Sequence, residues 1–467
     1  MFKIQRSLQG LLLIAIFTLF SVLLLTPVRA ATIYYVATNG SDSNPGTQNL
    51  PFATLSRAIE KVAAGDTVNV RGGIYYLKQG LWIGNEKTGT ESERIVFQSY
   101  PGEKAIIDGS NMPKKEPNDR DASHGQDAFA IAGRYIDIKG FEIRQTTRIG
   151  INVWGGSNIR IQNNVIHDIR GAGIYMGYSD PSKVTDIIVE GNQVYNTCIV
   201  NNPPSESGGW PSAISASGNG NIRITNNKVY NNYGEGIAFG SGSGALISGN
   251  TVYDNFSAEI YLLNATNSTV ANNLLYTTND SRFYRFNQPS PSIQLANESE
   301  ANKLDNNQII NNIALGGREG ISYYSSYGYG GGLRNTVIAN NTFYKATGTL
   351  LLIQKDAGHT NTLIANNIFY QTGSGAMTNL TANSGLRFQH NLWYGGSAGA
   401  AAGTGDVNAD PKLLNPGTTT HVDYKLQAGS PAIDAGTQLI KSVPNDYAGS
   451  SRTLGKGYDI GAYEYVQ

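Results

Sequence analysis

The chain contains 467 residues, 35 of them basic and 35 acidic, so its formal net charge is zero. This balance gives no electrostatic reason to expect nucleic-acid binding or attraction to a membrane surface. The 55 glycines accompany a hydrophobic fraction of 40%, which excludes a disordered chain and favours a β protein rich in turns. Because Cys198 is the only cysteine, an intrachain disulfide is excluded as well.

Residues 1–30 have the pattern of a secretory signal peptide. Lys3 and Arg6 precede an apolar run over residues 11–25, and small residues up to Ala30 follow it. The apolar run is short for a membrane span. We therefore expect cleavage after Ala30, no transmembrane span in the mature chain, and a secreted or cell-surface protein. An uncleaved anchor is the alternative.

Residues 31–75 form the first predicted structural unit, in the order strand, turn-rich loop, helix and strand. The helix is predicted at residues 53–64, and Gly65 ends it. An amphipathic helix of this kind is suited to covering the open end of a repeat structure. Its apolar face consists of Leu55, Ala58, Ile59 and Val62.

Residues 76–400 repeat one sequence motif, which consists of an asparagine, then an apolar pair or an apolar–tyrosine pair, and then a turn. The tightest intervals are 23, 23, 24 and 26 residues. A fixed period of that size without a helical pattern indicates a solenoid. Three short apolar alternations in each repeat predict an all-β fold, a parallel β-helix whose coils stack about 4.8 Å apart. The repeated residues are Asn164, Asn192, Asn227, Asn250, Asn273, Asn312, Asn341, Asn367 and Asn391.

Stacking of the coils should place these asparagines in one column. We expect each to occupy a left-handed coil corner and to bond the next amide in the stack. An aromatic residue usually follows three positions later, and His167 takes that place in its coil. Both columns are interpreted as structural supports. The tyrosines concerned are Tyr195, Tyr230, Tyr253, Tyr276, Tyr344 and Tyr370.

The stretch YYVATNGSDSNPGTQNLPFATLSRAIEKVAAGDTVNVRGGIYY resembles the N-terminal cap of secreted right-handed β-helix proteins. That group includes the family nine polysaccharide lyases of the pectate-lyase L type. The resemblance implies a right-handed helix with three strands per coil and a polysaccharide groove. Those lyases carry an Asp-rich calcium cluster beside a catalytic lysine, and residues 150–300 show no comparable run of aspartates. The cofactor therefore stays open, with calcium as the candidate.

Residues 404–467 resemble a choice-of-anchor domain of type Q, the kind found at the end of surface or secreted β-helix proteins. The similarity rests on Asp410-Pro411, on SPAIDAG at residues 430–436 and on DIGAYE at residues 459–464. We expect a small β-rich domain joined through the glycine- and alanine-rich stretch at 395–406. The sequence stops at Gln467 without a sorting motif or hydrophobic tail, so whether this domain anchors the protein stays open.

Two coils are longer than the others and locate a candidate site. Asn192 to Asn227 spans 35 residues and Asn273 to Asn312 spans 39, with the additional residues in loops 196–213 and 277–292. Long loops in a compact solenoid are usually functional. Both should border one strand stack, where alternation turns a polar and aromatic column outward. That column is Asn152, Tyr175, Ser215, Ala238, Tyr261, Gln294 and Ser322.

This face suits a sugar chain, because aromatic faces stack on pyranose rings and arginines pair with uronate carboxylates. A plain solvated face is the alternative. Elimination on a uronate polymer needs cations and a proton carrier, whereas glycoside hydrolysis needs a carboxylate pair. The predicted catalytic residues are Arg282, Arg285, Tyr261, Glu259 and Glu235, and the predicted substrate-binding residues are Tyr175, Trp210, Arg170, Arg318, Gln294 and Glu206. No metal ligand is predicted.

Glu235 and Glu259 lie in consecutive coils, but they stand two residues and one residue before their inward isoleucines. This difference in register argues against a retaining pair. The leading hypothesis is therefore a secreted lyase that acts as a monomer on an acidic polysaccharide. A glycoside hydrolase or uronate epimerase on the same scaffold, and a non-catalytic glycan-binding β-helix, are the alternatives.

Overall fold

The computed structural model describes residues 29–113, 124–177, 184–300, 303–325, 329–354, 358–380, 383–439, 441–452 and 454–466. The predicted signal peptide lies outside these residues except for Arg29 and Ala30. None of the described helices is long and apolar enough to cross a membrane.

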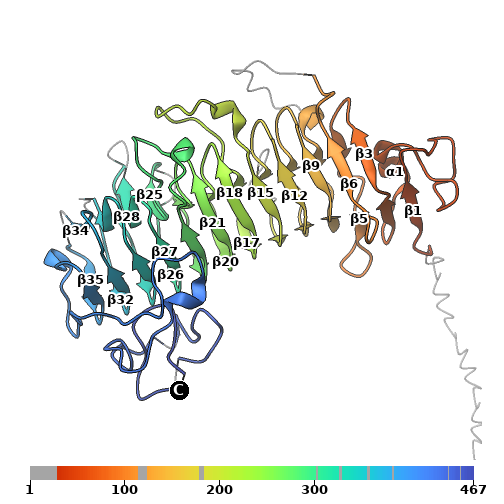
Figure 1. The fold of residues 1–467 in the computed structure, drawn as a ribbon. Coiled ribbons are helices and arrows are strands. Elements are labelled where there is room, and N and C mark those ends of the chain that lie inside the picture. The colour runs from red at the N-terminus through yellow and green to blue at the C-terminus, as the bar shows by residue number, and fades with distance from the viewer. Residues whose placement is uncertain are drawn as a thin grey trace, which may run out of the picture.

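The described chain winds into a right-handed β-helix of three parallel sheets, as predicted (Figure 1). Sheet A has the order β1 (Ile33–Val36), β2 (Thr67–Val70), β5 (Ile95–Ser99), β8 (Ile136–Lys139), β11 (Arg160–Gln162), β14 (Ile187–Glu190), β17 (Asn219–Thr225), β20 (Ser243–Ser248), β23 (Thr269–Ala271), β26 (Gln308–Ile310), β29 (Val337–Ala339), β32 (Thr362–Ala365) and β35 (Leu386–Gln389).

Sheet B contains the strand that follows each sheet A strand from β2 onward. Its order is β3 (Gly73–Tyr76), β6 (Ala105–Asp108), β9 (Glu142–Arg144), β12 (Val165–His167), β15 (Gln193–Tyr195), β18 (Lys228–Asn232), β21 (Thr251–Asn255), β24 (Leu274–Tyr276), β27 (Ile313–Leu315), β30 (Thr342–Tyr344), β33 (Ile368–Tyr370) and β36 (Leu392–Tyr394).

Sheet C completes each coil. Its order is β4 (Leu81–Ile83), β7 (Phe129–Ile131), β10 (Ile151–Val153), β13 (Ile174–Met176), β16 (Ile214–Ala216), β19 (Ile237–Gly240), β22 (Ile260–Leu263), β25 (Ile293–Asn297), β28 (Glu319–Ser325), β31 (Thr349–Ile353) and β34 (Ala376–Leu380). Short strands of β-branched residues fill the interior, where isoleucines of successive coils lie in register.

The asparagine column forms the predicted amide row between sheets A and B. Each backbone N–H and side-chain amide donates to the Oδ1 of the asparagine in the next coil, as from Asn227 to Asn250 at 2.9 and 3.0 Å. The row runs from Asn164 to Asn391 with every member buried. The expectation of a left-handed corner at these residues is wrong by one position. The positive φ belongs to the preceding residue, such as Asn226 or Gly249.

The aromatic column stacks on the outside of sheet B. His167 lies 4.9 Å from Tyr195 between ring centroids, and the stack continues through Tyr230 and Tyr253 to Tyr276. His167 is therefore a member of this stack, as its sequence position predicts.

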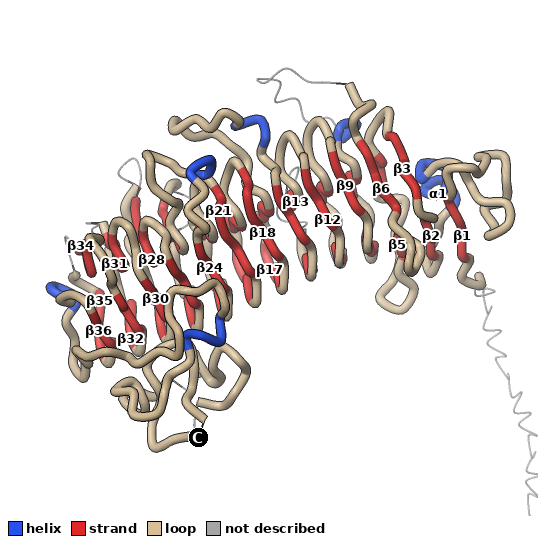
Figure 2. Tube along the Cα trace, in the orientation of Figure 1, coloured by secondary structure: helices blue, strands red, loops and turns tan. Residues whose placement is uncertain are grey.

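Helix α1 (Leu55–Lys61) covers the N-terminal end of the coils (Figure 2). Thr54 caps it, its hydroxyl accepting a hydrogen bond from the Arg57 N–H at 3.2 Å. The helix is shorter at both ends than the predicted 53–64. Its predicted apolar face is buried, as Leu55, Ala58, Ile59 and Val62 each have an exposed fraction of 6% or less.

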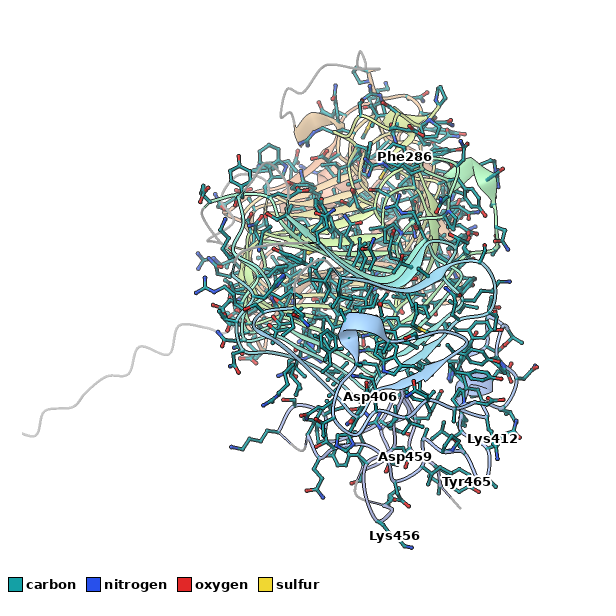
Figure 3. The ribbon with its side chains drawn as sticks, turned by 90° about the vertical axis from the view of Figure 1, so that its left-hand side faces the viewer. Phe286, Asp406, Lys412, Lys456, Asp459 and Tyr465 are labelled. Carbon is teal, nitrogen blue, oxygen red and sulfur yellow. The ribbon has the colours of Figure 1, made fainter. Side chains whose placement is uncertain are left out.

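The described residues within 404–466 pack against the outer face of sheet B beside its last strands (Figures 1 and 3). In their described part they form one 3-10 turn (His421–Tyr424) and isolated bridges in place of the expected β-rich domain. Asp406 ends the amide row by accepting from the Asn391 N–H at 2.9 Å. Leu413, Tyr424 and Ile460 share a core with sheet B residues, so this C-terminal unit is continuous with the β-helix.

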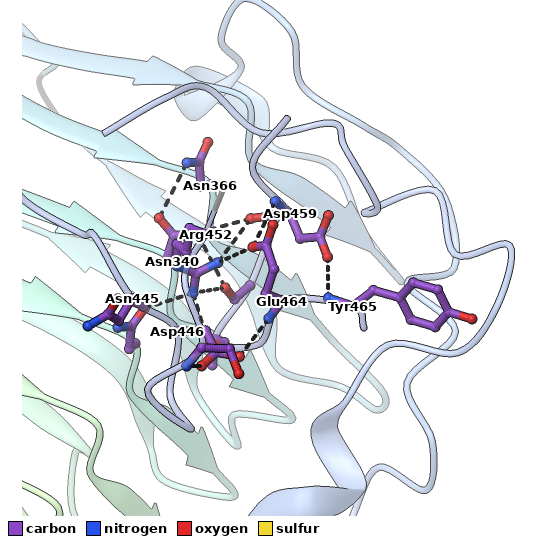
Figure 4. A network of polar contacts seen from close by, with 12 residues as sticks. Asn340, Asn366, Asn445, Asp446, Arg452, Asp459, Glu464 and Tyr465 are labelled. Carbon is purple, nitrogen blue, oxygen red and sulfur yellow. Dashed lines mark hydrogen bonds and ion pairs between the residues drawn. The ribbon is translucent and has the colours of Figure 1, made fainter. Parts of the chain in front are cut away.

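A buried arginine ties the C-terminal unit to the coils (Figure 4). Arg452 has no exposed surface and donates to Glu464 Oε2 at 3.2 Å and to Asn311 Oδ1 at 2.8 Å. Asp446 accepts from the Glu464 N–H at 3.0 Å. Arg452 and Glu464 thus form a buried ion pair that also contacts the coils, and loss of either partner would leave a buried charge uncompensated.

Candidate functional site

The face predicted to carry the site is the outer side of sheet C. Tyr175, Ser215, Ala238, Tyr261, Gln294 and Ser322 follow one another in register, and their isoleucine neighbours point inward. This register places in one row the side chains that alternation assigned to it.

The two long loops meet above this row. Arg285 Nη2 donates to the Glu206 carbonyl at 3.1 Å, and the Phe286 N–H donates to Glu206 Oε1 at 3.0 Å. The Arg285 guanidinium also lies 4.8 Å from the centre of the Trp210 ring. Each loop contains a short 3-10 turn, Ile199–Asn201 and Ser281–Phe283. Loops from separate coils thus form one bridge over sheet C.

A cavity of about 380 Å³ lies on one side of the bridge, and we call it the tyrosine cavity. Tyr175, Trp210 and Tyr261 line it together with Ser215 and Glu235. Its aromatic walls and small polar groups have the character of a sugar-binding surface.

A second cavity, of about 350 Å³, lies on the other side of the bridge, and we call it the arginine cavity. Arg285 and Arg318 both line it, and burial together with the charge of Arg318 lowers the pKa of Arg285. Arg318 pairs with Glu319, its Nε donating at 2.9 Å. Within the described residues, Ser322 Oγ and Arg285 Nε are buried without a hydrogen-bond partner. Glu319 lines the same cavity and pairs with Arg318, which leaves the Arg285 guanidinium and two unused polar atoms to favour an anionic ligand here.

Tyr261 and Tyr324 join the two cavities through their hydroxyl groups. The two oxygens lie 2.6 Å apart, and the Tyr324 hydroxyl donates to Glu298. Tyr261 has only 8% of its surface exposed, and burial raises its pKa far above the usual value. Burial likewise raises the pKa of Tyr324, which lines the arginine cavity beside Gln294. Both hydroxyl groups therefore stay protonated at neutral pH, and the hydrogen bond from Tyr324 leads to Glu298.

The two predicted carboxylates have separate environments. Glu235 lines the tyrosine cavity and accepts from Trp210 Nε1 at 2.8 Å and from Ser212 Oγ at 3.1 Å. Burial raises the pKa of Glu235 above its ordinary value.

Glu259 is 3% exposed, and burial raises its pKa to about 8. It accepts from Asn255 Nδ2 at 2.5 Å and from Ser290 Oγ at 2.8 Å. Asn255 in turn belongs to a second buried amide row that runs through Asn232 to Thr197. Glu259 thus ends that row, and this geometry agrees with the register argument against a pair with Glu235.

The remaining predicted residues lie around the bridge. Arg282 is 65% exposed and forms an ion pair with Asp280 at 2.5 Å. Arg170 is partly buried before β13, and its carbonyl accepts from the Val200 N–H at 2.8 Å. Arg170 is thereby connected to loop 196–213, but neither Arg170 nor Arg282 lines either cavity.

Tyr324 and Glu298 were not predicted. Tyr324 stands two positions after Ser322 on β28, so the same alternation that identified the outward row could have found it. Glu298 follows β25, and no periodic signal marks it.

A further cavity and the arrangement of metal-ligating side chains also bear on what the protein could bind. A larger cavity, about 580 Å³, lies at the N-terminal cap between Thr54, Leu55 and Tyr76. Lys78 supplies the cationic group of its lining, whereas the arginine cavity has two guanidiniums and unused polar atoms, so we favour the latter. In the described ranges, no group of three or more His, Cys, Asp or Glu side chains could hold a metal ion. The acidic side chains of these ranges therefore do not fit a calcium site built from clustered carboxylates.

Part of the chain is similar to known protein families. Residues 34–259 match the family model "Pel9A-like, right handed beta helix region", and residues 198–331 match the more general "Right handed beta helix region". The first match covers just under half of the chain.

Three curated relatives share shorter stretches. An uncharacterized protein YwoF of Bacillus subtilis is 37% identical over 140 residues, 29% of each chain. Pectate lyase PEL9 of Emericella nidulans is 38% identical over 99 residues, 21% of this chain and 23% of the relative. Pectate lyase L of Paenibacillus polymyxa is 30% identical over 196 residues, 41% of each chain. The matched stretches thus span less than half of each relative.

Solved structures agree on the fold. Pectate lyase Pel9A superposes with a TM-score of 0.53 at 19% identity, over 94% of this chain and 98% of that one. XylC in complex with xylose gives 0.59 at 12% identity, over 93% and 98%. At these identities the similarity concerns architecture alone. The protein is therefore a right-handed β-helix protein whose N-terminal half is similar to the Pel9A-like region.

Proposed function

We propose that this protein is a secreted polysaccharide lyase that cleaves an acidic, uronate-containing polymer by β-elimination. The observation that carries the proposal is the arginine cavity, in which Arg285 and Arg318 face one space beside the unused Ser322 hydroxyl. A uronate carboxylate would satisfy these groups. The pectate lyases among the relatives support the same substrate class.

Elimination removes the proton at C5 of the uronate and forms a C4=C5 double bond. The C4–O4 bond breaks, and O4 leaves with its electron pair and takes up a proton from solvent. The C5 proton would pass to the Tyr324 oxygen as the Tyr324 hydroxyl gives its own proton to Glu298. Neutralisation of the carboxylate by Arg285 and Arg318 would acidify C5 and stabilise the charge that develops in the transition state. The described residues that suit the proton transfer are Tyr324 and Tyr261, with Glu298 as the final acceptor.

Neighbouring sugars would lie in the tyrosine cavity, against Tyr175 and Trp210. The bridge between Arg285 and Glu206 would then lie over the chain near the reacting bond. Arg282 and Arg170 would contribute positive charge at the edge of this site.

A non-catalytic glycan-binding protein is the second candidate. It is favoured by the burial of Tyr261 and Glu259 in hydrogen bonds that stabilise the fold. A glycoside hydrolase is less favoured, because Glu235 and Glu259 have separate partners.

The test is incubation of the purified protein with polygalacturonate and alginate while the ultraviolet absorbance of a conjugated unsaturated uronate is followed. The proposal expects this absorbance to rise on at least one polymer. New reducing ends without the absorbance would support hydrolysis, and binding without either product would support the glycan-binding function.

A further inference from the structure

The outer row of sheet C continues beyond the proposed site toward the N-terminal end. Trp82, Ala130, Asn152 and Tyr175 pair in register across β4, β7, β10 and β13. The pattern of β4 shows the same alternation, with Leu81 and Ile83 buried and Trp82 exposed to 37%. Eight coil spacings separate Trp82 from Ser322, or roughly 38 Å at about 4.8 Å each.

At this distant end two tryptophans form an aromatic corner. Trp82 and Trp154 lie 6.3 Å apart between ring centroids with planes at 80°. The Arg148 guanidinium lies 5.7 Å from the centre of the Trp154 ring. Such a corner presents a large apolar surface beside a cation, at a position that sequence period alone did not select.

A buried carboxylate fixes the orientation of this corner. Asp127 has no exposed surface and accepts from Arg148 Nη1 at 2.8 Å, from Asn152 Nδ2 at 2.8 Å and from Trp154 Nε1 at 3.4 Å. Asn152 is also fully buried, and its Oδ1 has no partner among the described residues. Asp127 is thus a positioning residue, which holds three side chains of the next coil in one arrangement.

We infer that Trp82 and Trp154 form a remote subsite that stacks on a sugar ring of the polymer, far from the bond that is cleaved. This inference rests on the proposed function, since it assigns to the same substrate a second contact on the same face. A chain that lies along the coils from the arginine cavity would reach Trp82, whereas a short oligomer held at Arg285 would not. The protein should accordingly prefer long chains.

The experiment compares Trp82→Ala with wild type in affinity electrophoresis through gels that contain polygalacturonate or alginate. Tyr76→Ala is the matched control, because Tyr76 is an exposed aromatic residue, 55% accessible, on sheet B near the same end. Trp82→Ala should weaken polymer binding about fivefold to tenfold and leave binding of a uronate trimer unchanged. Trp154→Phe, which keeps an aromatic ring without the contact to Asp127, should weaken it less.

The outcomes separate the subsite from the proposed reaction. Weaker polymer binding by Trp82→Ala in a protein that yields no unsaturated product would support the subsite and overturn the lyase assignment. Unchanged polymer affinity in Trp82→Ala, or an equal loss in Tyr76→Ala, would overturn the subsite even if the wild-type protein is a lyase. Melting temperatures of the variants establish that each one is folded.

Discussion

The buried amide row shows at the scale of single residues how the coils hold their register. Asn250 donates to Asn273 through both its N–H and its side chain, and its Oδ1 accepts twice from Asn227. Its Nδ2 also donates to the Ile224 carbonyl at 2.8 Å. One side chain therefore satisfies buried groups of three coils, and its loss would leave them unpaired.

Asn250→Ala should lower the free energy of unfolding by about 1–3 kcal/mol, without lowering activity per folded molecule. Chemical denaturation measured by circular dichroism tests this. Asn85→Ala is the control, because Asn85 is exposed. Equal stability of the two variants would show that the amide row contributes little.

Glu259 should make stability depend on pH. Burial raises its pKa to about 8 from an ordinary value of 4.5, so the folded protein binds this proton more tightly than the unfolded chain. The contribution of Glu259 to the free energy of unfolding is full below pH 4.5 and is lost as pH rises through 8. Glu259→Gln removes this titration. Its melting temperature should fall less than that of wild type between pH 5 and pH 8 (roughly the window between the two pKa values), and parallel curves would contradict the assignment.

Tyr324→Phe separates proton transfer from binding. The phenyl ring keeps the wall of the arginine cavity but removes the hydroxyl that contacts Tyr261 and Glu298. We expect kcat to fall by about 10²–10⁴ with polymer binding little changed. Tyr261→Phe should have a smaller effect, because Tyr261 is one hydroxyl further from Glu298. A variant with wild-type kcat would exclude Tyr324 from the proton path.

At the scale of elements, the sequence predicted most of the framework. The coil period, the strand alternation and the amphipathic cap follow from short-range patterns, and each has a direct counterpart in the three sheets and in α1. Coil length also identified the two loops. The contacts of Glu206 with Arg285 and Phe286 could not be predicted, because they join residues about 80 positions apart, with no shared period.

The sequence also could not predict the backbone conformation at coil corners or the direction of individual side chains in the loops. The repeated asparagine and the residue before it are both often Asn, so composition did not reveal which of them adopts the left-handed conformation. Likewise, Arg282 and Arg285 lie in one loop, yet Arg282 pairs locally with Asp280 while Arg285 enters the cavity. Such differences arise from tertiary packing, which no local pattern encodes.

At the scale of the whole molecule, we expect the C-terminal unit and the β-helix to unfold together. Arg452 is fully buried and bonds to Glu464 within the unit and to Asn311 of the coils. Removing one partner of a buried ion pair leaves the other charge uncompensated.

Arg452→Ala should therefore lower the free energy of unfolding by about 3–5 kcal/mol. It should also broaden or split the thermal transition, because the unit would detach before the coils unfold. Differential scanning calorimetry measures both effects. Lys456→Ala, on the exposed surface of the same unit, is the control. A single unshifted transition in Arg452→Ala would show that the unit is held by its apolar contacts alone.

The central claim is that the tyrosine cavity and the arginine cavity on sheet C together bind an acidic polymer, which is cleaved with the help of Arg285. Its most direct test is the initial rate of unsaturated-product formation from a uronate polymer by wild type, Arg285→Ala and Arg223→Ala. Arg223 is exposed on sheet A and lines neither of the two cavities. The account predicts a rate at least about 100-fold lower for Arg285→Ala, since loss of a buried charge pair costs several kcal/mol, and a nearly wild-type rate for Arg223→Ala. Equal losses in the two variants, or full activity in Arg285→Ala, would contradict it.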